Sequence, residues 1–277
     1  MLTVNDHRRD SAGMRYVYPV VSRRAGGVSV GINLNVNNAC NWACIYCQVP
    51  GLKRGSPPPV DLDCLEAELR GFLQKDALAD SLRKNVPAGS RRLMDVAFSG
   101  NGEPTSAPEF AEAVGRLIAV LREMDLLNAL KIRLITNGSF MHRESVRAGI
   151  AAIGAVQVEV WFKLDCATES GMQRINGVCI APEKVRASLM QCCVQAPTWV
   201  QTCCFALDGE AASEEDQQRY LELIDSFKEH LQGVHLYGLA RPSLQPAANR
   251  LSPLDAAEFT AFSRRIAALG LRVVENP

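Results

Sequence analysis

Short apolar runs alternate with longer segments of helical periodicity along most of this chain. Apolar and small residues alternate over 28–36, which predicts a strand, and Asp61 then precedes an apolar stripe at helical spacing. The same order returns five times: strands are expected at 93–98, 132–135, 156–164, 199–205 and 234–239, and helices at 108–124, 142–153, 182–195, 213–231 and 254–269. Such alternation predicts right-handed crossovers and a mainly parallel α/β sheet, either open or rolled into a barrel.

The sequence predicts one domain over 28–277, preceded by an N-terminal extension over 1–27. Its 277 residues contain no linker or low-complexity tract, and residues 271–274 predict a short strand after the last helix. Apolar residues make up 47% of the chain and charged residues 22%, as in globular proteins. Without an apolar leader or a long apolar run, we expect a cytoplasmic protein with no membrane segment.

Basic and acidic residues are balanced, at 30 each. This balance excludes a global basic field for binding nucleic acid, although a local basic patch stays open. Ten cysteines in a chain with no expected secretion signal indicate metal binding, catalysis or burial in preference to a disulfide framework.

Three cysteines lie within eight residues, directly after the first expected strand. The segment reads Cys40-Asn41-Trp42-Ala43-Cys44-Ile45-Tyr46-Cys47. Three thiolates on one short loop can ligate three irons of a cubane cluster and leave the fourth iron open to a substrate. The alternative is a structural zinc site, which needs a fourth ligand, and the next cysteine, Cys64, lies on an expected helix.

The C-x3-C-x2-C spacing, with an aromatic residue before the third cysteine, resembles the signature of the radical S-adenosylmethionine superfamily. Further motifs follow in the superfamily's order: Gly100-Asn101-Gly102-Glu103-Pro104, Thr136-Asn137-Gly138, Phe162-Lys163-Leu164-Asp165 and Arg174-Ile175-Asn176-Gly177. The first of these resembles the Gly-Gly-Glu element, with Asn101 in place of a glycine. The resemblance covers about residues 28–239 and is nearest to the wyosine-synthase-like Fe–S oxidoreductases.

This resemblance implies a partial (β/α)6 TIM-like barrel with an N-terminal extension and a short C-terminal helix and strand. It implies a [4Fe–4S] cluster on Cys40, Cys44 and Cys47, with S-adenosyl-L-methionine on the open iron. One electron, from a donor of flavodoxin or ferredoxin type, would cleave the cofactor to a 5′-deoxyadenosyl radical that abstracts hydrogen from a substrate. That substrate, a small molecule, a peptide or RNA, stays open, as does the choice between oxidoreductase and transferase.

Every motif falls at the carboxyl end of an expected strand, where α/β barrels collect their active-site residues. Cofactor contacts are expected from Tyr46, Gly102, Glu103, Thr136, Asn137, Lys163 and Asp165. The Glu103 carboxylate would pair with the cofactor's ammonium, or else belong to a turn that caps the next helix. The alternative for Thr136 and Asn137 is a turn with Asn-Gly chemistry and no cofactor contact. The alternative for Lys163 and Asp165, which alternate along one strand and so share a face, is a mutual salt bridge of structural purpose.

Other residues are weaker candidates. Substrate contacts are expected from Arg174 and Arg241, of which the latter could bind a carboxylate or phosphate bidentately or lie in a solvated loop. Cys166 is a candidate hydrogen donor, and the cysteines outside the motif could hold an auxiliary cluster or simply be buried. Residues 165–181 form a long connection of the kind that often makes a lid.

Two functions of other classes stay open. One is a non-catalytic Fe–S protein for electron transfer or binding, and the other is a zinc-bound nucleic-acid module, which the balanced charge disfavours.

Overall fold

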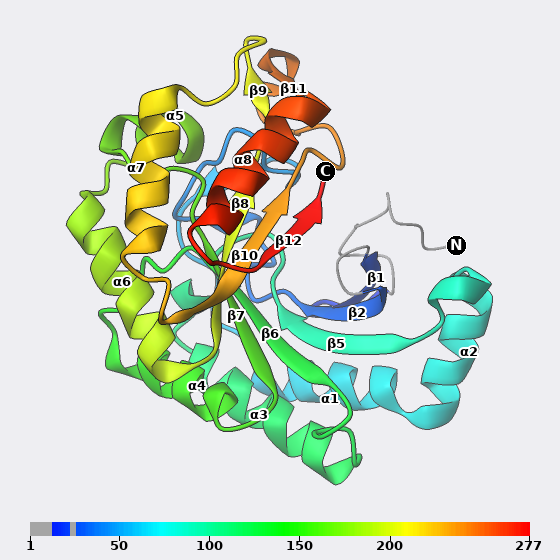
Figure 1. Cartoon of the computed structure of the whole chain (residues 1–277). Coiled ribbons are helices and arrows are strands. Elements are labelled where there is room, and N and C mark those ends of the chain that lie inside the picture. The colour runs from blue at the N-terminus through cyan, green and yellow to red at the C-terminus, as the bar shows by residue number, and fades with distance from the viewer. Residues whose placement is uncertain (1–12, 23–25) are drawn as a thin grey trace.

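The computed structural model describes residues 13–22 and 26–277 and is built around one eight-stranded sheet (Figure 1). In spatial order the strands are β1 (Val17–Ser22), β2 (Gly27–Ile32), β5 (Leu93–Phe98), β6 (Lys131–Thr136), β7 (Val158–Lys163), β8 (Thr198–Cys203), β10 (Leu231–Tyr237) and β12 (Val273–Asn276). Only β1 pairs antiparallel to its neighbour, β2. The sheet curls into a partial barrel, which confirms the predicted fold class.

Helices cover the convex face of the sheet (Figure 1). They are α1 (Leu62–Leu73), α2 (Lys75–Asn85), α3 (Phe110–Glu123), α4 (Glu144–Gly154), α5 (Glu169–Asn176), α6 (Pro182–Gln195), α7 (Glu214–Asp225) and α8 (Ala256–Ala268). Several start where the sequence provides a cap, as at Asp61, whose carboxylate accepts from the Cys64 amide. Two small sheets, β3 (Ala39–Cys40) with β4 (Lys53–Arg54) and β9 (Ala206–Leu207) with β11 (Leu251–Ser252), lie in the loops.

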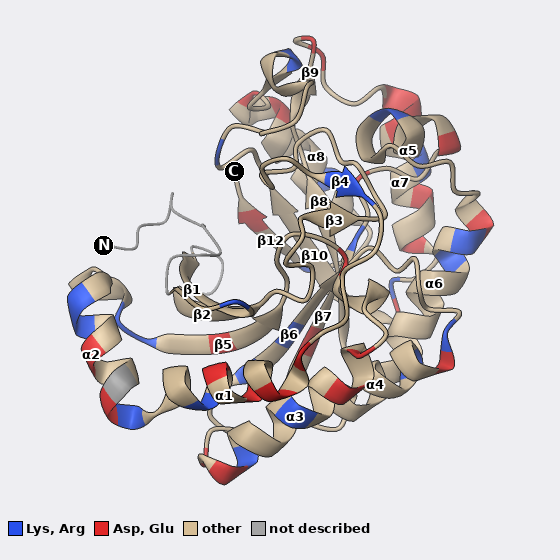
Figure 2. Cartoon of the chain, turned by 180° about the vertical axis from the view of Figure 1, so that it is seen from behind, with Lys and Arg blue, Asp and Glu red and all other residues tan. Residues whose placement is uncertain are grey.

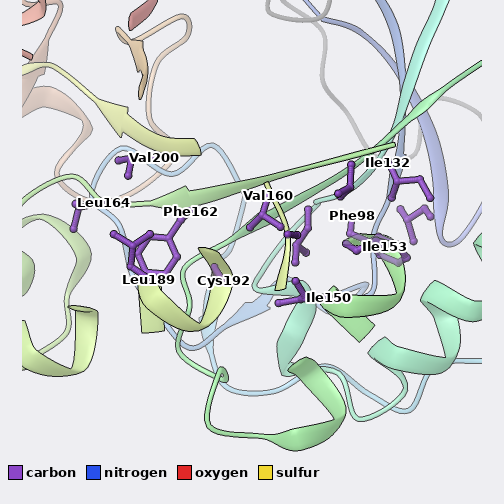
Figure 3. Packing of buried hydrophobic residues seen from close by; sticks show 14 of the residues in the cluster. Phe98, Ile132, Ile150, Ile153, Val160, Phe162, Leu164, Leu189, Cys192 and Val200 are labelled. Carbon is purple, nitrogen blue, oxygen red and sulfur yellow. The ribbon is translucent and has the colours of Figure 1, made fainter. Parts of the chain in front are cut away.

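The main core fills the space between the sheet and these helices. Figure 3 shows Phe98, Val160 and Phe162 of the strands packing toward Ile150 of α4 and Leu189 of α6. All five side chains are buried, and their burial stabilises the packing of this face of the sheet against the helices. The concave face is therefore free to carry polar side chains.

Four features differ from the sequence expectation. The expected extension contains β1, since its apolar run pairs with β2; residues 1–12 and 23–25 lie outside the described part. Helix α2 has no continuous apolar stripe to reveal it, and the long connection at 165–181 contains helix α5. The helix expected over 213–231 ends at Asp225, and Leu231 already begins β10.

No helix of the described residues is long and apolar enough to cross a membrane.

Candidate active site

The three-cysteine segment lies at the carboxyl end of β2 and is held from two sides. The carbonyl groups of Ile175 and Asn176, at the end of α5, each accept a bond of 2.9 Å from the amides of Ile45 and Ala43. On the other side the Ser243 hydroxyl donates to the Ile45 carbonyl at 2.7 Å. Segments more than 100 residues away in sequence thus fix the backbone of a loop that has little regular structure of its own.

Cys40, Cys44 and Cys47 are unpaired, half-buried thiols. Burial raises the pKa of Cys40 to about 11 and that of Cys44 to about 12. N–H groups nevertheless point at both sulfurs, from Trp42 at 3.4 Å and from Asn176 at 3.3 Å. Because of their burial, Cys40 and Cys44 are protonated near neutral pH unless a metal replaces the proton.

The three sulfurs line one cavity and do not converge on a point. Within the described residues, no three His, Cys, Asp or Glu side chains lie close enough together to hold one metal ion. In a cubane cluster each cysteine ligates its own iron, so spread sulfurs suit a cluster better than a single ion.

The cavity beside the cysteines has a volume of about 310 Å³ and reaches into the barrel. Of the predicted site residues, those lining it are the three cysteines, Tyr46, Gly102, Glu103, Asn137, Lys163 and Arg241. A second cavity of about 620 Å³ lies on the α5 and α6 side and is lined by Asp165 and Cys166, among others. Trp42, Asn137 and Lys163 line both cavities, which therefore adjoin at the mouth.

Glu103 is a buried acceptor that ties two strand ends together. Its carboxylate accepts from the Thr105 amide and hydroxyl, from the Thr136 hydroxyl at 2.7 Å and from the Asn137 amide at 2.6 Å. Burial raises the pKa of Glu103, and these four donors act in the opposite direction. The carboxylate is thus already engaged by protein donors, and Thr136, fully buried, lines neither cavity.

Gly102 is required by packing. A β-carbon at this position would lie 2.1 Å from the Ala39 carbonyl oxygen, so only glycine lets the end of β5 meet the cysteine loop. Asn137 strengthens the same junction, since its amide group donates to Asn41 Oδ1 at 3.0 Å.

Tyr46, Lys163 and Asp165 lie together at the ends of the cysteine loop and β7. The mutual salt bridge between Lys163 and Asp165, which was the alternative to cofactor contacts, is not found among the described residues. The Tyr46 hydroxyl donates to Asp165 at 2.5 Å, and Asp165 also accepts from the Asn176 amide group. Within the described chain Lys163 forms no ion pair with Asp165; its ammonium donates to the Tyr237 hydroxyl at 3.1 Å. Burial opposes the charge of Lys163, but Tyr237, Asp165 and Cys44 together raise its pKa above the usual value.

The weaker candidates separate clearly. Arg174 lies away from both cavities and pairs with Asp216 at 2.6 Å, which joins α5 to α7. Cys166 is buried on the wall of the second cavity, whereas Cys203, with Gln201 beside it, lines the first. The only sequence signal for Gln201 and Cys203 was that they lie two residues apart, and so on the same face, near the end of the strand expected over 199–205.

No family model matches the chain. Among curated proteins, it is 30% identical over 159 residues to a UPF0026 protein of Methanocaldococcus jannaschii. The matched stretch covers 57% of this chain and 42% of that protein. It is 24% identical over 150 residues to the GTPase Obg of Brachyspira hyodysenteriae, 54% of this chain and 19% of that protein. The chain thus spans less than half the length of either relative, and its own sequence has no Gly-Lys pair of a phosphate-binding loop.

Solved structures resemble the chain over most of its length. Streptococcus suis SuiB bound to S-adenosylmethionine superposes with a TM-score of 0.58 and 12% identity, over 86% of this chain and 48% of that one. A radical SAM methyltransferase from Sphaerobacter thermophilus superposes with a TM-score of 0.58 and 16% identity, over 90% of this chain and 66% of that one. TYW1 with a lysine-pyruvate adduct superposes with a TM-score of 0.55 and 14% identity, over 90% of this chain and 74% of that one. This chain therefore has the partial-barrel fold of these structures, one of which is a radical SAM methyltransferase.

Proposed function

We propose that this chain is a radical S-adenosylmethionine enzyme whose [4Fe–4S] cluster is held by Cys40, Cys44 and Cys47. One observation carries the proposal: the three thiols line the same cavity as Gly102, Glu103, Asn137 and Lys163, from strand-end motifs that follow the cysteine loop in sequence by up to 116 residues, from Cys47 to Lys163. When bound, the cluster and cofactor supply a 5′-deoxyadenosyl radical for hydrogen abstraction. The substrate would enter the 310 Å³ cavity, where it would meet that chemistry.

The residues around the cysteines suit this cofactor pair. The thiols are soft ligands, and the N–H groups directed at Cys40 and Cys44 stabilise their thiolate forms. We assign S-adenosylmethionine contacts to Gly102, Asn137 and Lys163, which reach a cavity. We assign Glu103 and Thr136 to positioning, because their polar groups bond to each other and to the Asn137 amide.

The test is anaerobic reconstitution of the full chain with iron and sulfide, followed by reduction with dithionite in the presence of S-adenosylmethionine. We expect 5′-deoxyadenosine and methionine as products. The electron-transfer alternative predicts a reduced cluster whose electron paramagnetic resonance signal is unchanged by S-adenosylmethionine, and no 5′-deoxyadenosine. That result from cluster-replete protein would overturn the proposal.

We further propose that an acidic one-electron donor docks beside β4. Lys53 and Arg54 form this exposed strand, which pairs with β3 at Cys40, and Figure 2 shows it as a basic segment over the mouth. Leu244, 56% exposed, lies next to the loop, and its amide donates to the Cys47 carbonyl at 3.0 Å. Exposed basic and apolar side chains at the cysteine loop suit an acidic protein of the flavodoxin or ferredoxin type.

Lys53→Glu tests this docking surface. Reversal of one rim charge should slow reduction of the cluster by an acidic flavodoxin roughly three- to tenfold at low salt, and less at high salt. Reduction by dithionite, measured by stopped-flow absorbance, should keep its rate. Lys75→Glu, on α2 away from the mouth, is the matched control. Equal slowing by both variants would contradict the assignment.

A further inference from the structure

Cys44 receives a hydrogen bond from a buried side chain. Asn176 is the last residue of α5 and is 1% exposed. Its Nδ2 donates to Cys44 Sγ at 3.3 Å, whereas the donor to Cys40 Sγ is the backbone amide of Trp42. Every residue except proline brings a backbone N–H, but only some residue types bring a side-chain donor. The bond to Cys44 therefore depends on the asparagine of the Arg174-Ile175-Asn176-Gly177 motif.

Asp165 fixes which end of the Asn176 amide faces the sulfur. Asn176 Nδ2 also donates to Asp165 Oδ2 at 2.8 Å, so the two N–H groups of one NH2 serve two acceptors. The reversed amide would place its oxygen against a carboxylate oxygen and a thiolate, neither of which has a hydrogen to donate. Asp165 is itself held, since it accepts from the Tyr46 hydroxyl at 2.5 Å and from the Cys203 amide at 3.0 Å. The amide is therefore oriented toward Cys44 by groups other than the cluster.

The end of α5 is held tightly against the cysteine loop. The Asn176 carbonyl accepts from the Ala43 amide at 2.9 Å, and the Arg54 guanidinium donates to the carbonyl groups of both Asn41 and Gly177. Gly177 ends the helix at a φ of 67°, and a β-carbon there would lie 3.1 Å from the Ala43 side chain. The helix end and the loop thus move as one unit, which keeps the donor beside Cys44.

We infer that Asn176 raises the reduction potential of the cluster through its N–H···S bond to the Cys44 thiolate. This rests on the proposed function for the presence of the cluster. The bond draws electron density from the sulfur and so stabilises the reduced cluster, which carries one more negative charge. Asn176 is a positioning residue, because it acts on the iron through Cys44 and makes the electron easier to accept.

Asn176→Leu tests this role, because leucine keeps the shape of the side chain and removes the donor. The full chain is loaded with its cluster and titrated with reductant under electron paramagnetic resonance, without S-adenosylmethionine. The equilibrium constant for one-electron reduction should fall about tenfold, which lowers the midpoint by about 59 mV. Gln173→Leu, at an exposed position of the same helix, is the matched control and should keep the midpoint of the unmodified chain.

A purely structural role for Asn176 predicts the opposite shift. Looser packing would let water reach the cluster, and water stabilises the more negative, reduced form, so the midpoint would rise. Only chains that hold a cluster contribute to the signal, so partial loss of iron does not move the midpoint. Asn176→Ala, which also lacks the donor and suits a helix, repeats the measurement if the leucine variant does not fold. An unchanged or higher midpoint in a folded variant overturns the inference.

Electron–nuclear double resonance in D2O gives a second readout on the unmodified chain. An exchangeable deuteron of the Asn176 amide should couple to the reduced cluster, and this coupling should disappear in Asn176→Leu and persist in Gln173→Leu. Spectra that are the same in all three proteins would also contradict the inference. Failure of the proposed function shows separately, as absence of 5′-deoxyadenosine from the unmodified, cluster-loaded chain.

Discussion

Cys44→Ala is expected to abolish the visible absorbance of the reconstituted protein and to lower 5′-deoxyadenosine formation by about 100-fold or more. Cys44 supplies one of the three thiolates on this loop, whose backbone N–H groups at Ala43 and Ile45 are bonded to α5 and whose carbonyl groups at Ile45 and Cys47 accept from residues 243–244. Two thiolates cannot hold three irons, so iron content should fall well below the four per chain expected for a full cluster.

Cys179→Ala is the matched control, because Cys179 is exposed, lines neither cavity and donates to Gln173 at 3.0 Å. It should retain iron, absorbance and product. A circular dichroism spectrum and Tm near those of the unmodified protein should show that Cys44→Ala still folds. Full iron content in folded Cys44→Ala would sink the assignment of the loop as the cluster site.

Most of the strand and helix pattern was predictable because most elements carry a signal in their own sequence. The helix expected at 182–195 matches α6, whose Pro182 marks the first turn. Helix α5 was missed although Thr168 caps its start and Gly177, at a φ of 67°, ends it. The segment is short and polar, so no apolar stripe drew attention to those caps. Strand β1 was missed because its stability depends on pairing with β2, which lies outside its own sequence.

The motif residues were predictable as a group, but their orientations were not. The sequence placed Glu103, Thr136 and Asn137 at strand ends, and the structure brings them together by hydrogen bonds across β5 and β6. Whether a strand-end carboxylate turns toward a ligand or toward a neighbouring strand depends on donors far away in sequence. For the same reason Gln201 looked like any polar strand residue, and Arg174 looked free until α7 brought Asp216 to it.

Glu103→Gln should lower the free energy of unfolding by about 2–4 kcal/mol and reduce 5′-deoxyadenosine formation more than tenfold. The glutamine keeps the shape of the side chain but replaces one acceptor oxygen by an NH2 group. That group would face an N–H or O–H donor of Thr105, Thr136 or Asn137, all of which now point at the carboxylate. Asn137 would move, and with it the bond that joins it to Asn41 of the cysteine loop.

Urea unfolding measures the stability, and the dithionite assay measures the product. Glu258→Gln, exposed on α8, is the matched control and should change neither. The two expected losses have one cause, because the hydrogen bonds from Thr136 and from the Asn137 amide to Glu103 hold the end of β6 and, through Asn137, the loop that carries the cysteines. A variant that lost activity at full stability would instead show that Glu103 contacts the cofactor directly, and the positioning role assigned to it here would be wrong.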